Sequence, residues 1–277
     1  MTMSLSGWSE QLLNTQAAAG SDSFFPTLNN LIAQVCQFDE ILVVHFSSQT
    51  TTKMLFQMPV NHDDHLDLYL SKLFVLDPFY VSSKKGNEGL FLLEQLHQGF
   101  GEDFDDYYRQ YFRHLNFADE LGYLIQLPDN NSCIHIELAK FNDSSKFKDV
   151  EIDALKDVFD IIKMLVINHQ QKLAPAAFEF ETSYVEDFHQ LFGTEILTPR
   201  EHDVSLLMMQ GYSVKSIAGH LSVGDETVKM HRKNIYAKLE VSSQPELMAL
   251  FIDLLVLAEP PVVVDPLVAY LKRKHSS

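Results

Sequence analysis

Three closely spaced sets of helix start and stop signals, all within residues 197–257, limit the fold of this chain more than any other feature. The first set joins Thr198, Pro199 and Glu201, which provide an N-cap, a proline at the first helical position and a capping box. Gly211 then supplies the left-handed position at which such a helix ends. The pattern predicts a short, well-delimited helix rather than a strand.

Two further helices follow after short turns. Ser213 can cap a second helix, and Ser222–Gly224 read as a tight turn into a third helix that runs from about Asp225 to Leu239. Two helices joined in this way form a helix-turn-helix, in which the second helix lies in the major groove of DNA. The sequence therefore predicts an all-α helix-turn-helix module in this part of the chain.

The third predicted helix carries a stripe suited to contact DNA. Val228, Ile235 and Leu239 share one face, which we expect to be buried. At about 100° per residue, Met230 and Lys233 then lie on the opposite face, where lysines can reach guanine edges or phosphates. An ordinary solvated helix face would show the same pattern. The predicted DNA-binding residues are Thr227, Lys229, Met230, Arg232, Lys233, Asn234 and Lys238.

Three strings in this segment resemble the LuxR-type DNA-binding domain, which also occurs in response regulators of the NarL and FixJ kind. They are LTPRE at 197–201, GYSVKSIAGHLSV at 211–223 and ETVKMHRKNIYAKL at 226–239. The resemblance implies four helices, DNA recognition by the third, and dimerisation through the fourth at residues 243–257. The apolar stripe of that fourth helix would be Leu247, Leu250, Phe251 and Leu254.

The sequence departs from the family pattern at three positions, which are Ser216, Gly224 and Glu240. Ser216 replaces the usual Glu before Ile-Ala, Gly224 replaces a Ser cap, and Glu240 replaces a closing Gly or Asn. A glycine in place of a serine N-cap costs only a few tenths of a kcal/mol, about 0.3 kcal/mol, so we expect the recognition helix to form.

The charge distribution divides the chain into two modules. The formal net charge is -17, and residues 1–195 carry 12 Lys and Arg against 29 Asp and Glu, whereas residues 196–277 carry 9 of each. This balance argues against broad nonspecific binding to phosphate or to an anionic membrane, so we expect any DNA contact to be local. The asymmetry predicts a sensor domain at 1–172, a connector at 173–194, the helix-turn-helix domain at 195–257 and a C-terminal extension at 258–277.

The first module mixes strand and helix periods. Residues 122–127 and 132–140 flank the turn sequence PDNN and form the clearest hairpin. The strand-like runs 40–46 and 53–58 predict a second hairpin, and the helical patterns are 24–38, 64–76 and 148–171. Asp77-Pro78 ends the second of these helices. This order predicts an α+β fold in which helices pack on a small antiparallel sheet.

The order of these elements resembles GAF or PAS-like sensor domains and, more distantly, the acyl-homoserine-lactone domain of quorum-sensing regulators. A lactone, another small apolar or amphipathic ligand, a partner protein and no ligand at all remain open. Ligand pockets are mostly apolar with few polar groups, although core packing explains the same aromatic residues. The candidate ligand-binding residues are Tyr69, Phe74, Asp77, Phe79, Tyr80, Tyr108 and Tyr123.

Catalytic and metal-binding signals are weak. The chain has no G-x-S-x-G, no glycine-rich phosphate loop and no H-E-x-x-H, so we expect neither an enzyme nor a cofactor. His62–His65 could bind a metal, but an exposed polar helix start explains the same residues. Cys36 and Cys133 form no C-x-x-C pair and fit a reducing cytoplasm. The N-terminus lacks a signal-peptide pattern, and no apolar run is long enough to span a membrane.

Together these observations predict a cytoplasmic bacterial transcription factor that binds double-stranded DNA. We expect a homodimer that reads an inverted repeat and contacts RNA polymerase, with a signal in the N-terminal sensor controlling the position of the helix-turn-helix modules. The alternative is an acidic adaptor that binds polymerase or another regulator and keeps the fold without specific DNA affinity.

Overall fold

The computed structural model describes residues 4–47, 52–60, 64–96, 117–128, 132–141, 146–173 and 184–274. The described residues fall into two compact units. The first unit takes its residues from 4–64, 82–96 and 117–173, and the second from 65–81 and 184–274. Residues 65–81 therefore belong to the same unit as the helix-turn-helix segment, whereas the charge pattern had assigned them to the first module.

The first unit is built on a five-stranded antiparallel sheet in the order β2-β1-β5-β4-β3. Both predicted hairpins are confirmed, since β1 pairs with β2 and β4 pairs with β5. The long β1–β5 pairing joins the two hairpins, and the edge strand β3 was not predicted. The strands are β1 (Glu40–Ser47), β2 (Lys53–Met58), β3 (Gly89–Leu92), β4 (Phe117–Gln126) and β5 (Ser132–Phe141).

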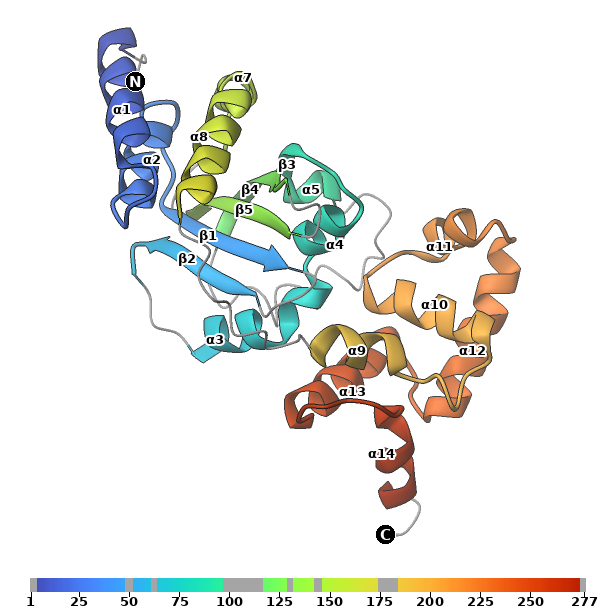
Figure 1. Ribbon diagram of the computed structural model, residues 1–277. Coiled ribbons are helices and arrows are strands. Elements are labelled where there is room, and N and C mark those ends of the chain that lie inside the picture. Colours follow the sequence, from blue (N-terminus) through green and yellow to red (C-terminus); the bar gives the residue numbers. More distant parts are fainter. Residues whose placement is uncertain are drawn as a thin grey trace. The chain divides into compact units, whose positions relative to one another are not determined.

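Helices from both ends of this unit pack with the strands around one core (Figure 1). They are α1 (Leu5–Ala18), α2 (Phe24–Ala33), α7 (Asp149–Asp157) and α8 (Phe159–Lys172), and a short helix α5 (Leu93–Leu96) follows β3. Alternate strand residues such as Ile41 and Val43 enter this core, as the two-residue period of a strand requires. The structure thus confirms the predicted α+β class.

The predicted single helix at 148–171 is wrong in one respect, because the structure divides it into α7 and α8. Val158 ends one helix and begins the next, with φ -93° and ψ -1°, and its amide donates to the carbonyl of Ala154. Leu155 and Ile162 on either side of this break are both fully buried. They are seven residues apart and so lie on nearly the same helix face, which is why the apolar period does not reveal the break.

The predicted helix at 64–76 is also divided. It consists of α3 (Asp64–Ser71) and the 3-10 helix η1 (Leu73–Leu76), and α4 (Pro78–Lys84) follows directly. All four residues of η1 are buried. One side of a surface α-helix normally faces water, so burial of four successive residues favours an interruption of the helix here.

Residues 184–274 of the second unit contain the four predicted helices and two more. The predicted four are α10 (Pro199–Met209), α11 (Val214–Leu221), α12 (Asp225–Leu239) and α13 (Gln244–Leu257). The others are α9 (Tyr184–Leu191), which lies inside the predicted connector at 173–194, and α14 (Pro266–Lys274), which lies inside the C-terminal extension. The connector prediction missed α9 because this helix has only eight residues, fewer than the window of about 11–18 residues over which helical periodicity is judged.

Aromatic rings hold α9 and α13 together. The ring of Phe251 lies 5.4 Å from that of Phe188, 5.0 Å from that of Phe192 and 5.9 Å from that of His189, measured between centroids. Burial lowers the pKa of His189 to about 4, so its ring packs as a neutral group at pH 7. Most of the α13 stripe that was predicted to mediate dimerisation, Leu247, Leu250 and Phe251, is buried within this unit.

The C-terminal extension packs on the turn between α9 and α10. The side chain of Asp265 accepts hydrogen bonds from the backbone amides of Gly193 and Glu195, both at 2.9 Å, and from Leu267 at 3.0 Å. Asp265 is 1% exposed, and Leu267 is fully buried. Asp265 also begins α14 as an N-cap before Pro266, a sequence signal that could have revealed this helix.

Replacing Asp265 with Asn should detach this extension. Oδ1 accepts from Gly193 and Leu267 and Oδ2 accepts from Glu195, so an amide leaves at least one buried donor unpaired, at a cost of about 1–2 kcal/mol. We expect faster hydrogen exchange in α14 and in the α9–α10 turn. Asp253→Asn on the exposed side of α13 is the control. Equal exchange rates in the two variants would contradict this role of Asp265.

In the described part of the chain, no helix is long and apolar enough to span a membrane.

Candidate nucleic-acid interface

The first helix of the module begins at the predicted capping box. The Thr198 Oγ1 accepts from the Glu201 amide at 3.4 Å, and the Glu201 Oε2 accepts from the Thr198 amide at 2.9 Å. Glu201 also accepts from the Lys238 ammonium at 2.5 Å, and its side chain is only 5% exposed. Burial alone would raise the pKa of Glu201, but the hydrogen bonds from Lys238 and Thr198 and the Lys238 charge lower it to about 2.

A short turn connects α11 to α12, the predicted recognition helix. The Ser213 hydroxyl accepts from the Ser216 amide at 3.3 Å, so the predicted cap of α11 is confirmed. Ser222 then adopts a left-handed conformation with φ 54°, and Gly224 stands at the N-cap of α12 without a side-chain hydrogen bond. Glu240 ends α12, also in the left-handed region with φ 55°. The departures at Gly224 and Glu240 therefore leave both ends of the recognition helix formed.

The predicted division of α12 into two faces is confirmed. Val228, Ile235 and Leu239 are fully buried, whereas Met230 is 53% exposed. Lys229, Lys233 and Asn234 are also exposed, and Thr227 and Arg232 are half-buried. The buried face packs against α10 and α11, so the opposite face is free of both helices. This arrangement exposes Met230 together with Lys229, Lys233 and Asn234 on the side of the helix opposite its buried face.

Several charged residues on α12 contact other side chains of the same helix. Lys229 donates to Glu226 at 2.7 Å, and this interaction raises the pKa of the lysine. Arg232 donates to the Tyr236 hydroxyl at 3.1 Å. The Lys229–Glu226 pair is exposed, where an ion pair contributes little to stability, whereas the Arg232–Tyr236 hydrogen bond is partly buried.

Lys238 differs from the other candidates. Its pairing with the buried Glu201 ties α12 to the start of α10, a structural role that the sequence did not predict. The capping box in the sequence identified Glu201 as a capping residue. It did not indicate that Lys238, 37 positions further along the chain, contacts Glu201.

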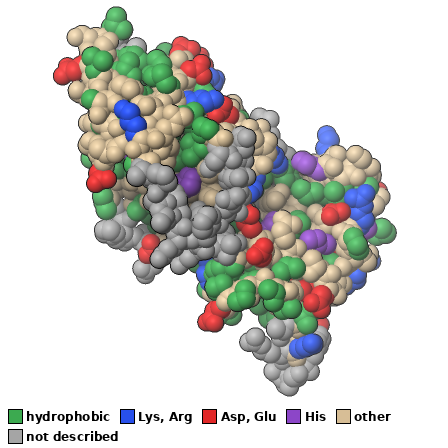
Figure 2. All heavy atoms as spheres, viewed as in Figure 1, with side chains coloured by type: hydrophobic (Ala, Val, Ile, Leu, Met, Phe, Trp, Pro, Cys, Tyr) green, Lys and Arg blue, Asp and Glu red, His purple; other side chains and the backbone are tan. Residues whose placement is uncertain are grey.

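Lysines and arginines do not form a continuous patch around this module on the face in Figure 2, where they are scattered among acidic and uncharged side chains. This distribution agrees with the balanced charge of the segment. DNA binding by this surface would depend on a few specific contacts rather than on a broad positive electrostatic potential.

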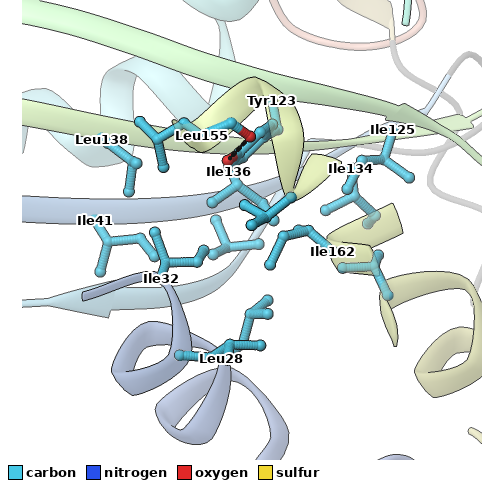
Figure 3. Packing of buried hydrophobic residues seen from close by; sticks show 14 of the residues in the cluster. Leu28, Ile32, Ile41, Tyr123, Ile125, Ile134, Ile136, Leu138, Leu155 and Ile162 are labelled. Carbon is cyan, nitrogen blue, oxygen red and sulfur yellow. Dashed lines mark hydrogen bonds between the residues drawn. The ribbon is translucent and has the colours of Figure 1, made fainter. Parts of the chain in front are cut away.

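The predicted ligand-binding residues do not form one cluster. Tyr123 lies in the core of the first unit, where its hydroxyl donates to the Leu155 carbonyl at 2.8 Å (Figure 3). In the second unit, Tyr69 donates to the carboxylate of Asp77, and the rings of Phe74 and Tyr80 are 4.9 Å apart. Phe79 is fully buried, and its amide donates to Asp77 at 2.7 Å. Tyr108 lies outside the described residues.

Asp77 carries the one carboxyl group among these candidates, and it is buried, with 3% of the residue exposed. Burial raises its pKa to about 6, although the hydrogen bonds from Tyr69 and from the Phe79 amide oppose this shift. The side chains of the proposed His62–His65 metal site lie outside the described residues. Within the part of the chain that the structure describes, no group of three or more potential metal ligands comes together.

Residues 195–251 match the family described as bacterial regulatory proteins of the luxR family. A relative from Aeromonas salmonicida, "Putative HTH-type transcriptional regulator in exeN 3'region", is 30% identical over 192 residues, which are 66% of this chain and 96% of that protein. The match thus extends over nearly the whole length of the relative.

Two solved structures match this chain at low similarity. The VqsR LBD domain from Pseudomonas aeruginosa is 22% identical, with a TM-score of 0.48, over 60% of this chain and 98% of that one. Escherichia coli SdiA is 15% identical, with a TM-score of 0.42, over 92% and 99% of the two chains. Because residues 195–251 match the luxR family and the Aeromonas salmonicida relative matches over 96% of its length, this chain belongs to the LuxR family of helix-turn-helix, DNA-binding transcriptional regulators.

Proposed function

We propose that the chain acts as a homodimer that reads an inverted repeat in double-stranded DNA through the exposed face of α12. The observation that supports this proposal is that α12 has one buried face and one exposed face. Val228, Ile235 and Leu239 are buried, whereas Met230 and Lys233 are exposed. Lys229 and Lys233 are one helical turn apart and would contact guanine edges or phosphates, and Met230 would contact a thymine methyl.

We propose that the dimer interface uses residues other than Leu247, Leu250 and Phe251 of the predicted stripe. Leu247, Leu250 and Phe251 serve the core of their own unit, so α13 would have to present other residues to a second copy. Val256 and Leu257 at its end are 42% and 76% exposed. In such a dimer, the two recognition helices would contact DNA half-sites about 34 Å apart. We also propose that the DNA-bound dimer contacts RNA polymerase.

We also propose that the remainder of the chain senses a small apolar or amphipathic ligand. Support comes from the cluster of Phe74, Tyr80 and Tyr69 around the buried carboxyl of Asp77, since ligand sites combine an apolar lining with few polar groups. A signal at this cluster would alter the DNA-binding module by favouring one of two conformations.

The test is selection of bound sequences from a random DNA pool with the full-length protein at near-physiological salt. We expect an enriched inverted repeat, and Lys233→Ala should weaken binding to it about tenfold and relax the base preference. The Lys229/Lys233 double alanine variant should abolish enrichment.

A double alanine variant at Lys146 and Lys156, two exposed lysines of the first unit, is the charge-matched control. It should bind as the wild type does. Equal losses in both double variants would contradict the groove assignment, because nonspecific charge would then explain binding. Enrichment of a single half-site without its inverted copy would contradict the dimer.

A further inference from the structure

The segment from Leu66 to Tyr80 connects two distant parts of the sequence. It follows β2 and precedes β3 along the chain, yet it belongs to the second unit, where η1 packs against α9. Two of its side chains make polar contacts with helices that lie more than 100 positions away. These contacts are made inside the unit that carries the DNA-binding helices.

Lys72 caps the C-terminal end of α13. Its ammonium donates to the carbonyl oxygens of Leu255 at 3.0 Å, Val256 at 2.7 Å and Ala258 at 3.4 Å. The last carbonyls of a helix lack partners within the helix and carry the negative end of its dipole. The last turn of α13 contains no basic residue of its own, so Lys72 supplies the cation from another segment.

A second contact joins the other end of this segment to α9. The Tyr80 hydroxyl donates to a carboxylate oxygen of Glu186 in the first turn of that helix. Burial and the neighbouring Glu186 charge raise the pKa of Tyr80, so the hydroxyl remains a proton donor at every physiological pH. The Lys72 ammonium also lies 5.9 Å from the ring of Tyr184 at the start of α9.

The turn between the two contacts is itself fixed. Asp77 accepts hydrogen bonds from Tyr69 on one side and from the Phe79 amide on the other. Lys72 and Tyr80 therefore sit on either side of one braced turn, and a change in that turn would move both contacts together.

We propose that residues 66–80 form an intramolecular clamp, in which Lys72 holds α13 and Tyr80 holds α9, and that this clamp restrains the helix-turn-helix module from its DNA-bound arrangement. The DNA part of this inference rests on the proposed function. A dimer on an inverted repeat must place two recognition helices about one helical turn of DNA apart, and a clamped module is less able to adjust. Release of the clamp would therefore favour DNA binding by a shift in population.

The first experiment tests whether Lys72 holds α13. Lys72→Met removes the ammonium and keeps an unbranched stem. We expect amide hydrogen exchange at residues 254–258 of the full-length protein to become about tenfold faster, the size expected when hydrogen bonds to a charged group are lost at a partly exposed site. Lys156→Met, an exposed lysine on α7, is the control and should leave exchange there unchanged. Indistinguishable rates in the two variants would overturn the clamp.

The second experiment tests regulation with the DNA enriched by selection. Lys72→Met and Tyr80→Phe should each raise the affinity of the full-length protein at least about fivefold, the lower end of typical coupling between sites. Tyr80→Phe keeps the ring against Phe74 and removes only the donor. The Lys156→Met control should leave the affinity unchanged.

The two readouts separate the possible failures. Faster exchange at residues 254–258 together with unchanged or weaker DNA binding would contradict the claim that the clamp restrains DNA binding. The proposed DNA-reading function would not be affected by that result. Absence of sequence-specific binding by all the proteins would contradict the proposed function, and exchange at α13 would then decide on the clamp alone.

Discussion

Phe251→Ala should destabilise the DNA-binding unit by about 3–5 kcal/mol, the range observed when a large aromatic side chain is removed from a core. Phe251 is fully buried, and its ring packs edge-on against those of Phe188, Phe192 and His189. The substitution leaves a cavity at the point where α9 and α13 meet, so the lost contacts cannot be replaced from solvent.

The measurement must report on this unit alone. The single tryptophan, Trp8, lies on α1 in the first unit, so its fluorescence would not follow the loss. Hydrogen exchange at the amides of α10, α12 and α13 does follow it, and each 1.36 kcal/mol lost corresponds to about tenfold faster exchange through global opening. Val263→Ala in the same unit, at a side chain 73% exposed, should change stability by less than about 0.5 kcal/mol. Similar losses in the two variants would contradict the packing described here.

Lys238→Met should cost about 3 kcal/mol at neutral pH. The change leaves the carboxylate of Glu201 buried without its ammonium partner, and breaking a buried ion pair from one side typically costs about 3–5 kcal/mol. The lower end applies because Lys238 is 37% exposed and water can partly replace it. The same hydrogen-exchange measurement on α10 and α12 reports the loss.

The pH dependence provides an independent check on the Lys238 prediction. The pKa of Glu201 lies at about 2 in the folded protein and at its ordinary value of 4.5 when unfolded. A depressed carboxyl pKa contributes stability that is complete above pH 4.5 and is lost as the pH falls towards 2. The difference in stability between wild type and Lys238→Met should therefore be constant from pH 7 to about pH 5.5 and shrink below pH 4.5. A constant difference down to pH 3 would show that the loss arises from packing of the lysine stem.

Local sequence signals predicted much of the second unit because each signal acts over a few residues. Thr198 with Glu201, Ser213, and the buried series Val228, Ile235 and Leu239 were all found in the predicted roles. The PDNN turn likewise predicted the β4–β5 hairpin, since hairpin pairing is set by turn chemistry and alternation. In these cases the interacting residues are neighbours in the chain.

The errors occurred where burial by distant segments decided the backbone. The break at Val158 leaves the apolar period intact, and α9 has only eight residues, too few for its period to stand out in a longer window. Of the α13 residues that the sequence assigned to a dimer interface, Leu247, Leu250 and Phe251 are buried within their own unit, and Phe251 packs against α9. An apolar stripe predicts that a helix face is buried, but its composition does not identify the segment or the partner chain that buries it.

The sequence by itself determined the antiparallel sheet, the helix-turn-helix and the polar face of α12, because capping, turn chemistry and periodicity are properties of adjacent residues. Only the tertiary structure showed three contacts between distant residues. Lys238 donates to Glu201, Asp265 accepts from the Gly193 amide and so holds the C-terminal extension, and Lys72 caps α13. Each of these pairs joins residues 37 to 186 positions apart. Such contacts form only when packing of the apolar core has already brought the segments together, and no local pattern encodes that proximity.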